Sequence, residues 1–308
     1  MIHENRITVS VIIPTYNRAS LLKRSIDSVL SQTFGDFEVI IVDDGSTDDT
    51  EEVVCGVRDP RIKYIKYNEN RGATAARNVG IRAARGEFIA FQDSDDEWLP
   101  EKLEKQMNVF KKAARDVGVV YVGFWKLKNG RKIYIPAKAV KKRQGAIYEE
   151  LIKRNFVSTQ TILVRSECFA KTGLFDEKLS RLQDWDIVLR LSRYYKFCFI
   201  EEPLVLQHYT PGSISDNSGA LMESIELIID KNREYLYKHK KILSRHYFRM
   251  GSELCSDGRI KDGRSYLIKS IRHNILNIPA LLFFTLSGAG FGKNNFKRLD
   301  ELITYLTN

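Results

Sequence analysis

The feature that most constrains this chain is an alternation of apolar runs with amphipathic stretches through its first 92 residues. Four short runs have the composition of buried strands: residues 7–13, 37–42, 62–67 and 87–91. The stretches between them place apolar residues at helical spacing, as Leu22, Ile26 and Val29 do. This repetition predicts a parallel sheet with right-handed crossovers and helices on its faces. Such sheets bind ligands at the carboxyl ends of their strands.

After the fourth strand the pattern changes. We expect helices over 100–115 and 184–194, a hairpin of 117–127 with 131–135, a strand over 161–164, and extended pieces at 197–200 and 204–208. From Ala220 onward the pattern is helical, and residues 245–281 resemble a helical hairpin of tetratricopeptide type. We therefore predict an α/β fold with a mostly parallel sheet over residues 1–220, followed by a helical, basic region over 221–308.

Length and cysteine usage exclude some classes of protein. A chain of 308 residues favours one large domain with a smaller appendage. Its four cysteines lie far apart, with no CxxC pair and no histidine at metal-ligand spacing. A disulfide scaffold and a structural zinc site are therefore not expected.

The positive charge of the chain is concentrated near its end. Residues 231–308 hold 15 basic and 6 acidic residues, which accounts for +9 of the formal net charge of +10. A nucleic-acid enzyme would carry such charge around its catalytic cleft, so we expect no nucleic-acid partner. A basic tail on a neutral body predicts contact with an anionic surface, and an anionic membrane is one candidate.

Neither end of the chain has the pattern of a secretory signal or a membrane span. The first six residues lack a basic segment followed by an apolar run. The uncharged stretch 274–292 is interrupted by Pro279 and by glycines, whereas a spanning helix needs about 20 mostly apolar residues. We expect an interfacial or core-packed segment here, and a cytoplasmic protein that could act at the inner face of the cell membrane.

Acidic residues follow two of the predicted strands. Asp43 and Asp44 come after the second strand, and Asp93, Asp95 and Asp96 come after the fourth. Carboxylates that meet at one edge of a sheet repel each other and need a cation or a hydrogen-bonded ligand. Mg²⁺ or Mn²⁺ takes oxygen ligands and can bridge carboxylates to a diphosphate.

For Asp96, and for Asp48 and Asp49 further along the chain from Asp44, a structural role at a helix start is the alternative. Asp48, Asp49 and Asp96 could simply begin helices, as capping and first-turn acids do. We favour that interpretation for Asp48 and Asp49.

The positions of Asp44 and Arg77 are suited to binding a nucleotide. A carboxylate just beyond a strand end can accept a hydrogen bond from a ribose hydroxyl or a base N–H. Arg77 lies on the helix after the third strand, within reach of the same edge, and its alternative role is that of a solvated helix arginine.

Eight segments together resemble family 2 glycosyltransferases, which have the GT-A fold. They occur in the family's order over residues 7 to about 210: Val9–Arg18, Ser31–Phe34, Val42–Asp48, Asn70–Gly72, Ala76–Gly80, Gly86–Asp96, Gly173–Glu177 and Gln183–Asp186. A DxD motif alone would not identify the family, whereas eight segments in the family's order are specific for it.

The resemblance implies roles on the donor side. Pro14, Thr15 and Asp44 would hold the nucleobase of a nucleotide-sugar donor, expected to be a UDP-sugar, with Arg77 nearby. Asp93 would contact the ribose or the sugar.

It also implies a metal site and a base. Asp95, third in the DxD-like run, would bind Mn²⁺ or Mg²⁺ on the diphosphate, and His208 would add a metal or diphosphate contact. A histidine that ends a strand is as often structural. Asp184 matches the acid proposed as general base, although Gln183 replaces the glutamate that precedes it in the family.

The expected reaction is an inverting transfer of a sugar to a hydroxyl of a glycan or lipid-linked acceptor, in the synthesis of cell-surface polysaccharide. Asp184 would deprotonate the acceptor, and a single displacement would invert the anomeric carbon.

Three other functions are alternatives to sugar transfer. A degenerate transferase that only binds nucleotide sugars stays open, and a haloacid dehalogenase-type phosphatase is less favoured because Asp43 and Asp44 are adjacent. A nicotinamide dehydrogenase is disfavoured because no GxGxxG follows a strand.

Overall fold

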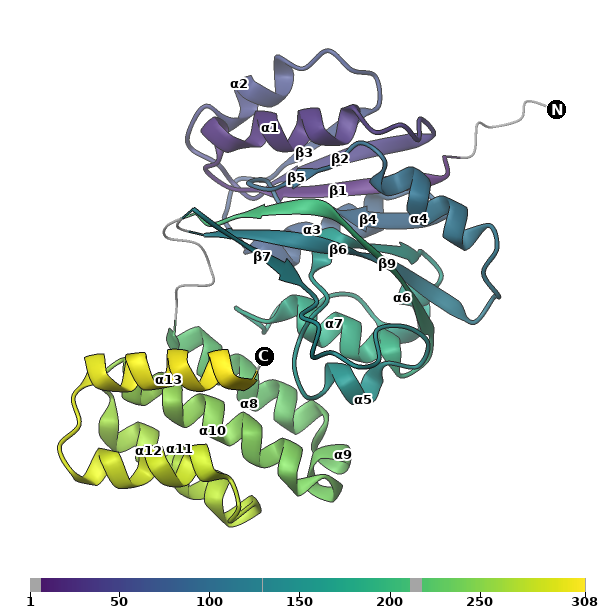
Figure 1. The fold of residues 1–308 in the computed structure, drawn as a ribbon. Coiled ribbons are helices and arrows are strands. Elements are labelled where there is room, and N and C mark those ends of the chain that lie inside the picture. The colour runs from purple at the N-terminus through teal and green to yellow at the C-terminus, as the bar shows by residue number, and fades with distance from the viewer. Residues whose placement is uncertain (1–6, 129, 211–217, 308) are drawn as a thin grey trace. The chain divides into compact units, whose positions relative to one another are not determined.

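The computed structural model describes residues 7–128, 130–210 and 218–307 (Figure 1). It forms two compact units. The first comprises Met1–Lys178 and Gln183–Ser213, and the second comprises Leu179–Leu182 and Ile214–Asn308.

The first unit is built on one mixed sheet. Its strands run in the order β3-β2-β1-β4-β8-β6-β9-β5, and β7 pairs with β6 outside this path. The strands are β1 Val9–Thr15, β2 Phe37–Asp43, β3 Ile62–Lys66, β4 Phe88–Phe91, β5 Glu97–Trp98, β6 Val117–Lys128, β7 Arg131–Ile135, β8 Ile162–Arg165 and β9 Lys196–His208. All except β5, β7 and β8 point the same way. The predicted α/β fold with a mostly parallel sheet is confirmed.

Helices cover both faces of this sheet. They are α1 Ala19–Leu30, α2 Thr50–Cys55, α3 Ala73–Ala83, α4 Lys102–Phe110, α5 Tyr148–Leu151, α6 Cys168–Thr172 and α7 Gln183–Ser192, with a 3₁₀ turn η1 Thr159–Thr161.

The alternation of side chains along each strand decides which helix covers which face. Val39 and Ile41 of β2 join the core cluster that contains Leu22 and Ile26 of α1. Ile40 and Val42 point the other way and pack with Ala76 of α3. A strand buried on both faces favours consecutive apolar residues over polar alternation, as residues 11–13 of β1 and 39–42 of β2 show.

Two sequence-based boundaries differ from the structure. The extended pieces at 197–200 and 204–208 form one strand, β9, in which the register against β6 shifts around Gly123 and Pro203. Proline lacks an N–H for the ladder and is tolerated at such irregularities, so Pro203 bulges the strand without ending it. The helix expected over 100–115 is shorter, because α4 ends at Phe110.

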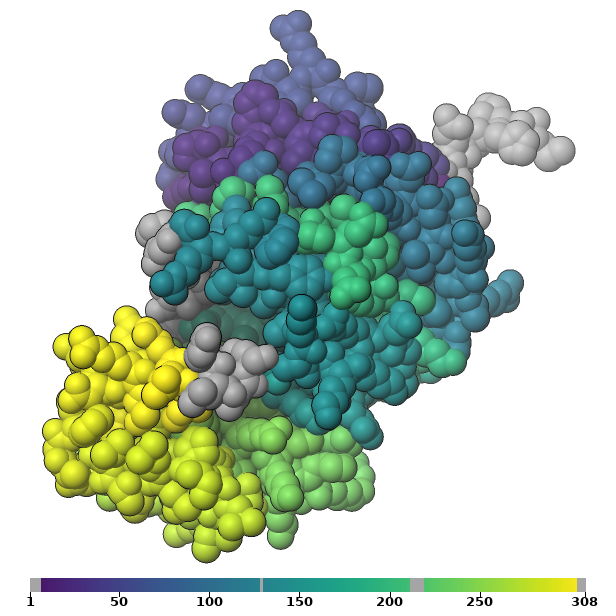
Figure 2. Space-filling view, in the orientation of Figure 1, coloured from purple at the N-terminus to yellow at the C-terminus, as the bar shows by residue number. Residues whose placement is uncertain are grey.

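The second unit is helical. Its elements are α8 Ser218–Lys231, α9 Arg233–Lys238, α10 Lys240–Ser256, α11 Ile260–His273, α12 Ile278–Gly288 and α13 Lys293–Thr307, coloured light green to yellow in Figure 2. Two glycines let α10 and α11 approach closely. A Cβ on Gly251 would lie 2.8 Å from the Leu267 side chain, and one on Gly263 would lie 2.9 Å from the Gly251 carbonyl oxygen.

Part of the uncharged stretch 274–292 is packed into this unit. Ala280 and Phe283 of α12 are fully buried, in a cluster with Leu267 and Phe296. Within the described parts of the chain, no helix has both the length and the apolar character needed to cross a bilayer.

Gly80 sets how closely α3 lies on β1. A Cβ at this position would come within 2.4 Å of Ile12 Cγ2, and Ile12 is fully buried. We expect Gly80→Ala to lower the free energy of unfolding by about 1–3 kcal/mol, because the closely packed core cannot accept the added methyl group. Urea unfolding measures this change.

Gly35→Ala is the matched control, since its Cβ would meet no atom within 4 Å. It should change the free energy of unfolding by less than about 0.5 kcal/mol. Equal stability of the two variants would contradict the packing described here.

Candidate active site at the carboxyl edge of the sheet

The carboxyl ends of β1, β2 and β4 meet at one edge of the sheet. The ladder continues past the strands, since Asp44 N–H donates to the Thr15 carbonyl at 2.9 Å and Gln92 N–H to the Ile12 carbonyl at 2.9 Å. The two acidic runs that the sequence analysis singled out therefore lie at this edge.

The first acidic run mainly organises loops. Asp43 is fully buried and accepts hydrogen bonds from Ser46 N–H at 2.9 Å and from the Tyr64 hydroxyl at 2.6 Å. Asp44 is 2 % exposed and accepts from Arg71 N–H at 2.8 Å and Gly72 N–H at 2.7 Å. Asp44 thus fixes the loop that leads into α3, and its oxygens keep spare acceptor capacity.

Arg77 is not a solvated helix arginine. Its side chain is buried and forms an ion pair with Asp93, with 2.7 Å between Nη2 and Oδ1. Its Nε is buried without a hydrogen-bond partner among the described residues, and the same holds for Thr15 Oγ1. Unpartnered buried polar atoms are rare in folded proteins and call for an explanation such as an absent ligand.

The second acidic run is held by cations and by backbone groups. Arg18 Nη1 lies 3.8 Å from Asp95 Oδ2. Asp96 is 2 % exposed and accepts from His208 N–H at 2.8 Å and Gln160 Nε2 at 3.0 Å. Burial, followed by the charges of Asp93 and Asp95, raises the pKa of Asp96 well above its usual range. The alternative that Asp96 begins a helix is wrong, because β5 follows it.

His208 reaches this edge as the last residue of β9. Its Nε2 lies 2.7 Å from Glu97 Oε1, and Arg24 Nε is 3.4 Å from the same carboxylate oxygen. No three His, Cys, Asp or Glu side chains converge on a ready-made metal site anywhere in residues 7–128, 130–210 and 218–307. The donors present suit a hard cation that also takes oxygens from a bound diphosphate.

Asp184 lies at the start of α7 and is half-buried. Its Oδ2 accepts from Asn155 Nδ2 at 2.8 Å, and its Oδ1 accepts from Trp185 N–H at 2.8 Å. Burial raises the pKa of Asp184, while the Trp185 N–H, Arg77 and Asn155 oppose the rise and Asp93 adds to it. Asp184 is thus within electrostatic range of the Arg77–Asp93 pair.

Asp186, two residues further along α7, has a structural role. It pairs with Arg190 at 2.8 Å, and Arg190 also donates to the Leu174 carbonyl at 2.8 Å. The Asp186 carboxylate thus orients Arg190, which links α7 to the preceding segment.

The structure therefore brings most of the predicted residues to one edge. Thr15, Asp44, Arg77, Asp93, Asp95 and Asp184 gather there, and Pro14 precedes Thr15 in β1. The sequence did not point to the residues that hold this edge and Asp184 in place: Arg18, Arg24, Asn155 and Gln160. Arg18 could have been found, because it ends the segment Val9–Arg18. Asn155 carried no signal, since it is 29 residues away from Asp184 in a region without motifs.

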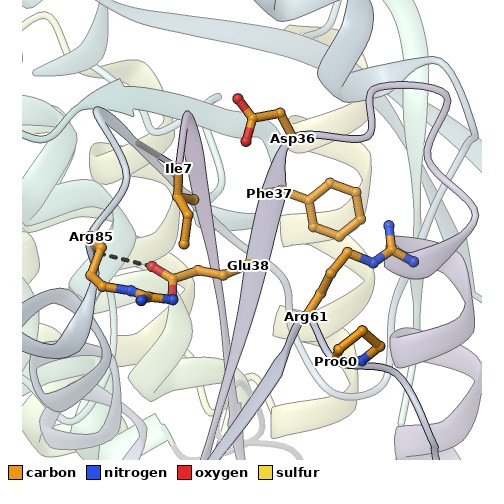
Figure 3. A pocket seen from close by; sticks show the side chains of 7 residues that line it. All are labelled: Ile7, Asp36, Phe37, Glu38, Pro60, Arg61 and Arg85. Atoms are coloured by element: carbon orange, nitrogen blue, oxygen red, sulfur yellow. Dashed lines mark hydrogen bonds and ion pairs between the residues drawn. The ribbon is translucent and has the colours of Figure 1, made fainter. Parts of the chain in front are cut away.

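A hollow of about 450 Å³ lies at the opposite, amino edge of the sheet (Figure 3). Two carboxylates line it. Asp36 accepts from Thr8 N–H at 3.4 Å, and Glu38 accepts from the Ser10 hydroxyl at 2.7 Å and from Arg85 Nη2 at 2.9 Å. Although burial opposes ionisation, these hydrogen bonds hold the pKa of Glu38 below its usual value. With its polar groups satisfied, the hollow has no feature of a reactive site.

Comparison with known proteins finds similar sequences over most of this chain. Residues 10–173 match the family model described as Glycosyl transferase family 2. An uncharacterized glycosyltransferase of Rickettsia typhi is 31% identical over 246 residues, which cover 78% of this chain and 77% of that protein. WcaA of Escherichia coli, described as a colanic acid biosynthesis glycosyl transferase, is 32% identical over 224 residues, covering 70% and 77%.

Two solved structures have the same fold. S. aureus TarS 1-349 in complex with UDP-GlcNAc aligns with a TM-score of 0.67 at 23% identity, covering 86% of this chain and 81% of TarS. The mannosyltransferase PcManGT of Pyrobaculum calidifontis, in complex with GDP-Man and Mn²⁺, aligns with a TM-score of 0.60 at 17% identity, covering 91% and 79%.

The hydrogen bond from Asn155 stabilises the ionised form of Asp184. We expect Asn155→Ala to raise the pKa of the Asp184 carboxyl further, because a donor to the carboxylate is lost while its burial remains. Any rate that requires ionised Asp184 then falls off at a higher pH in the variant. Carbon-detected NMR titration of the aspartate side chains, with Asp184→Asn to assign the signal, measures the pKa directly. A pKa that stays the same or falls would contradict this account of Asp184.

Proposed function

This chain belongs to glycosyltransferase family 2, and from that premise we propose that it moves a sugar from a UDP-sugar to a hydroxyl of a glycan or lipid-linked acceptor, with inversion at the anomeric carbon. The observation that carries the proposal is the Arg77–Asp93 ion pair, which acts on the pKa of Asp184. A donor-binding edge and a potential base thereby belong to one site. The similarity to WcaA, which is described as acting in colanic acid biosynthesis, supports a place in polysaccharide synthesis.

The donor would lie along the strand ends. Pro14, Thr15 and Asp44 would contact the nucleobase, and the unpartnered Thr15 Oγ1 would gain a hydrogen bond. The free Nε of Arg77 would face the donor, and Asp93 would contact its ribose or sugar. TarS binds UDP-GlcNAc and PcManGT binds GDP-Man, which supports a nucleotide-sugar donor for this fold.

Mn²⁺ or Mg²⁺ fits the donor set at the second acidic run. Asp95 would hold the cation, with His208 as a further ligand or a diphosphate contact, and PcManGT contains Mn²⁺. When bound, the cation supplies positive charge to the departing nucleoside diphosphate. Arg18, 3.8 Å from Asp95, is a permanent positive charge of the chain beside the same group.

Asp184 would accept the proton of the acceptor hydroxyl. A general base works best when its pKa lies near the operating pH, and burial moves the pKa of Asp184 in that direction. Asn155 and the Trp185 N–H hold one carboxylate oxygen each, so the remaining lone pairs have a fixed direction. Attack from the face opposite the diphosphate inverts the anomeric carbon without a covalent intermediate.

A phosphatase of the haloacid dehalogenase class is less well supported by this geometry. Its nucleophile would be Asp43, but that carboxylate is fully buried and bonded to Ser46 and Tyr64. A degenerate transferase that only binds nucleotide sugar differs from the proposal in having no turnover, and the following experiment separates the two.

Two substitutions separate the roles of catalysis and metal-dependent donor binding in the proposed site. We expect Asp184→Asn to lower sugar transfer by about 10²–10⁴-fold while Mn²⁺-dependent binding of the donor persists. We expect Asp95→Asn to abolish the dependence of donor binding on Mn²⁺, because one anionic ligand is removed. Calorimetric titration with UDP-sugars and a turnover assay for released UDP measure the two properties.

The control is Asp49→Asn, which makes the same charge change at an exposed position. It should leave both properties unchanged. Transfer by Asp184→Asn within a few-fold of the wild type would refute the role of the base. Donor binding with no turnover by the wild-type chain would favour the degenerate alternative.

A further inference from the structure

The turn between α11 and α12 exposes more apolar side chain than any other place in the described residues. Ile275, Leu276 and Ile278 are 71%, 74% and 64% exposed, the highest values among the large hydrophobic residues there. Leu282, one turn further along α12, is 39% exposed. We call these four residues the apolar tip.

A buried polar network holds the apolar tip in this position. Asn277 Nδ2 donates to Ser244 Oγ at 3.0 Å and to Ser270 Oγ at 3.1 Å, and its Oδ1 accepts from Ala280 N–H, which caps α12. Asn277 is 8% exposed, between neighbours that point outward. The exposure of Ile275, Leu276 and Ile278 is therefore fixed by the fold.

Two basic residues lie near the apolar tip, and the sequence segments next to it contain no acidic residue. Residues 235–252 and 263–299 contain no Asp or Glu. The exposed Arg272 lies in the last turn of α11. Burial and then the nearby charge of Lys240 lower the pKa of His273, and the His273 ring is 5.8 Å from that of Tyr237, which is 54% exposed.

We propose that the apolar tip inserts into the headgroup region of an anionic lipid leaflet, with Lys240 and Arg272 against the lipid phosphates. Apolar and aromatic side chains flanked by basic ones suit that interface. With 11 residues, α12 is about 16 Å long. It can enter one leaflet but cannot cross a hydrocarbon core of ~30 Å.

Charge favours a membrane over a second copy of the chain. Two tips brought together would place Lys240 and Arg272 of each copy beside those of the other, and like charges in contact are unfavourable. An anionic leaflet instead neutralises the same residues. The proposal is independent of the sugar-transfer reaction, so either one can fail without the other.

The test is co-sedimentation of the full chain with phosphatidylglycerol–phosphatidylcholine vesicles and with pure phosphatidylcholine vesicles, at low and high salt. We expect binding only to the anionic vesicles, and weaker binding at high salt. Ile275→Ser with Leu276→Ser should lower the partition constant by about 100-fold or more, since each large aliphatic side chain contributes about tenfold or more. Lys240→Glu with Arg272→Glu should lower it by at least about tenfold.

Leu302→Ser with Ile133→Ser is the matched control, because those side chains are 54% and 51% exposed but lie outside the apolar tip. It should bind vesicles like the wild type. Leu276→Trp gives a second readout, as its fluorescence emission should shift to shorter wavelength with anionic vesicles. No binding by the wild type, unchanged binding by the Ile275/Leu276 variant, or a dimer that this variant abolishes would each overturn the proposal.

Discussion

Negative charge crowded at one edge of the sheet is the constraint on which the site depends. The chain directs β1, β2 and β4 the same way, so the acids that follow β2 and β4 have to share one edge. Asp44 is compensated by two backbone N–H groups, Asp93 by Arg77, and Asp95 by Arg18. Asp96 accepts hydrogen bonds from neutral donors, and its pKa is raised although the charge of Arg24 opposes the rise. The compensation is therefore uneven, and the least compensated acid, Asp96, is adjacent in sequence to Asp95, where a cation is proposed.

The position of α3 links this edge to α7. Gly80 allows α3 to lie against Ile12 of β1, and Arg77 projects from the same helix to Asp93. Asn78 accepts from Phe175 N–H at 2.9 Å and donates to the Phe175 carbonyl at 2.9 Å. The segment 173–177 is joined to α7 in turn, because Arg190 donates to the Leu174 carbonyl. A short chain of contacts thus connects the donor edge to the helix that bears Asp184.

The sequence predicted what depends on local pattern. Buried strands such as β1 and β2 leave short runs of β-branched apolar residues between helical stretches, which favours strands. The acids that follow β2 and β4 then fall at the carboxyl edge because the strands are parallel. It did not predict what depends on folding together distant segments. The Asn155–Asp184 hydrogen bond, the pairing of His208 with Glu97, and the Gln160–Asp96 contact join residues without a shared periodicity or motif. The prediction of two extended pieces instead of the single strand β9 has another cause: in sequence, a proline within a bulged strand resembles a strand end.

The most direct test of the proposed site is a crystal structure of the Asp184→Asn variant with an intact UDP-sugar and Mn²⁺. We expect the nucleobase beside Thr15 and Asp44, the diphosphate and metal at Asp95, and the anomeric carbon facing residue 184 from the side opposite the diphosphate. A nucleotide bound at the Glu38–Arg85 hollow, or an anomeric carbon facing away from residue 184, would contradict it.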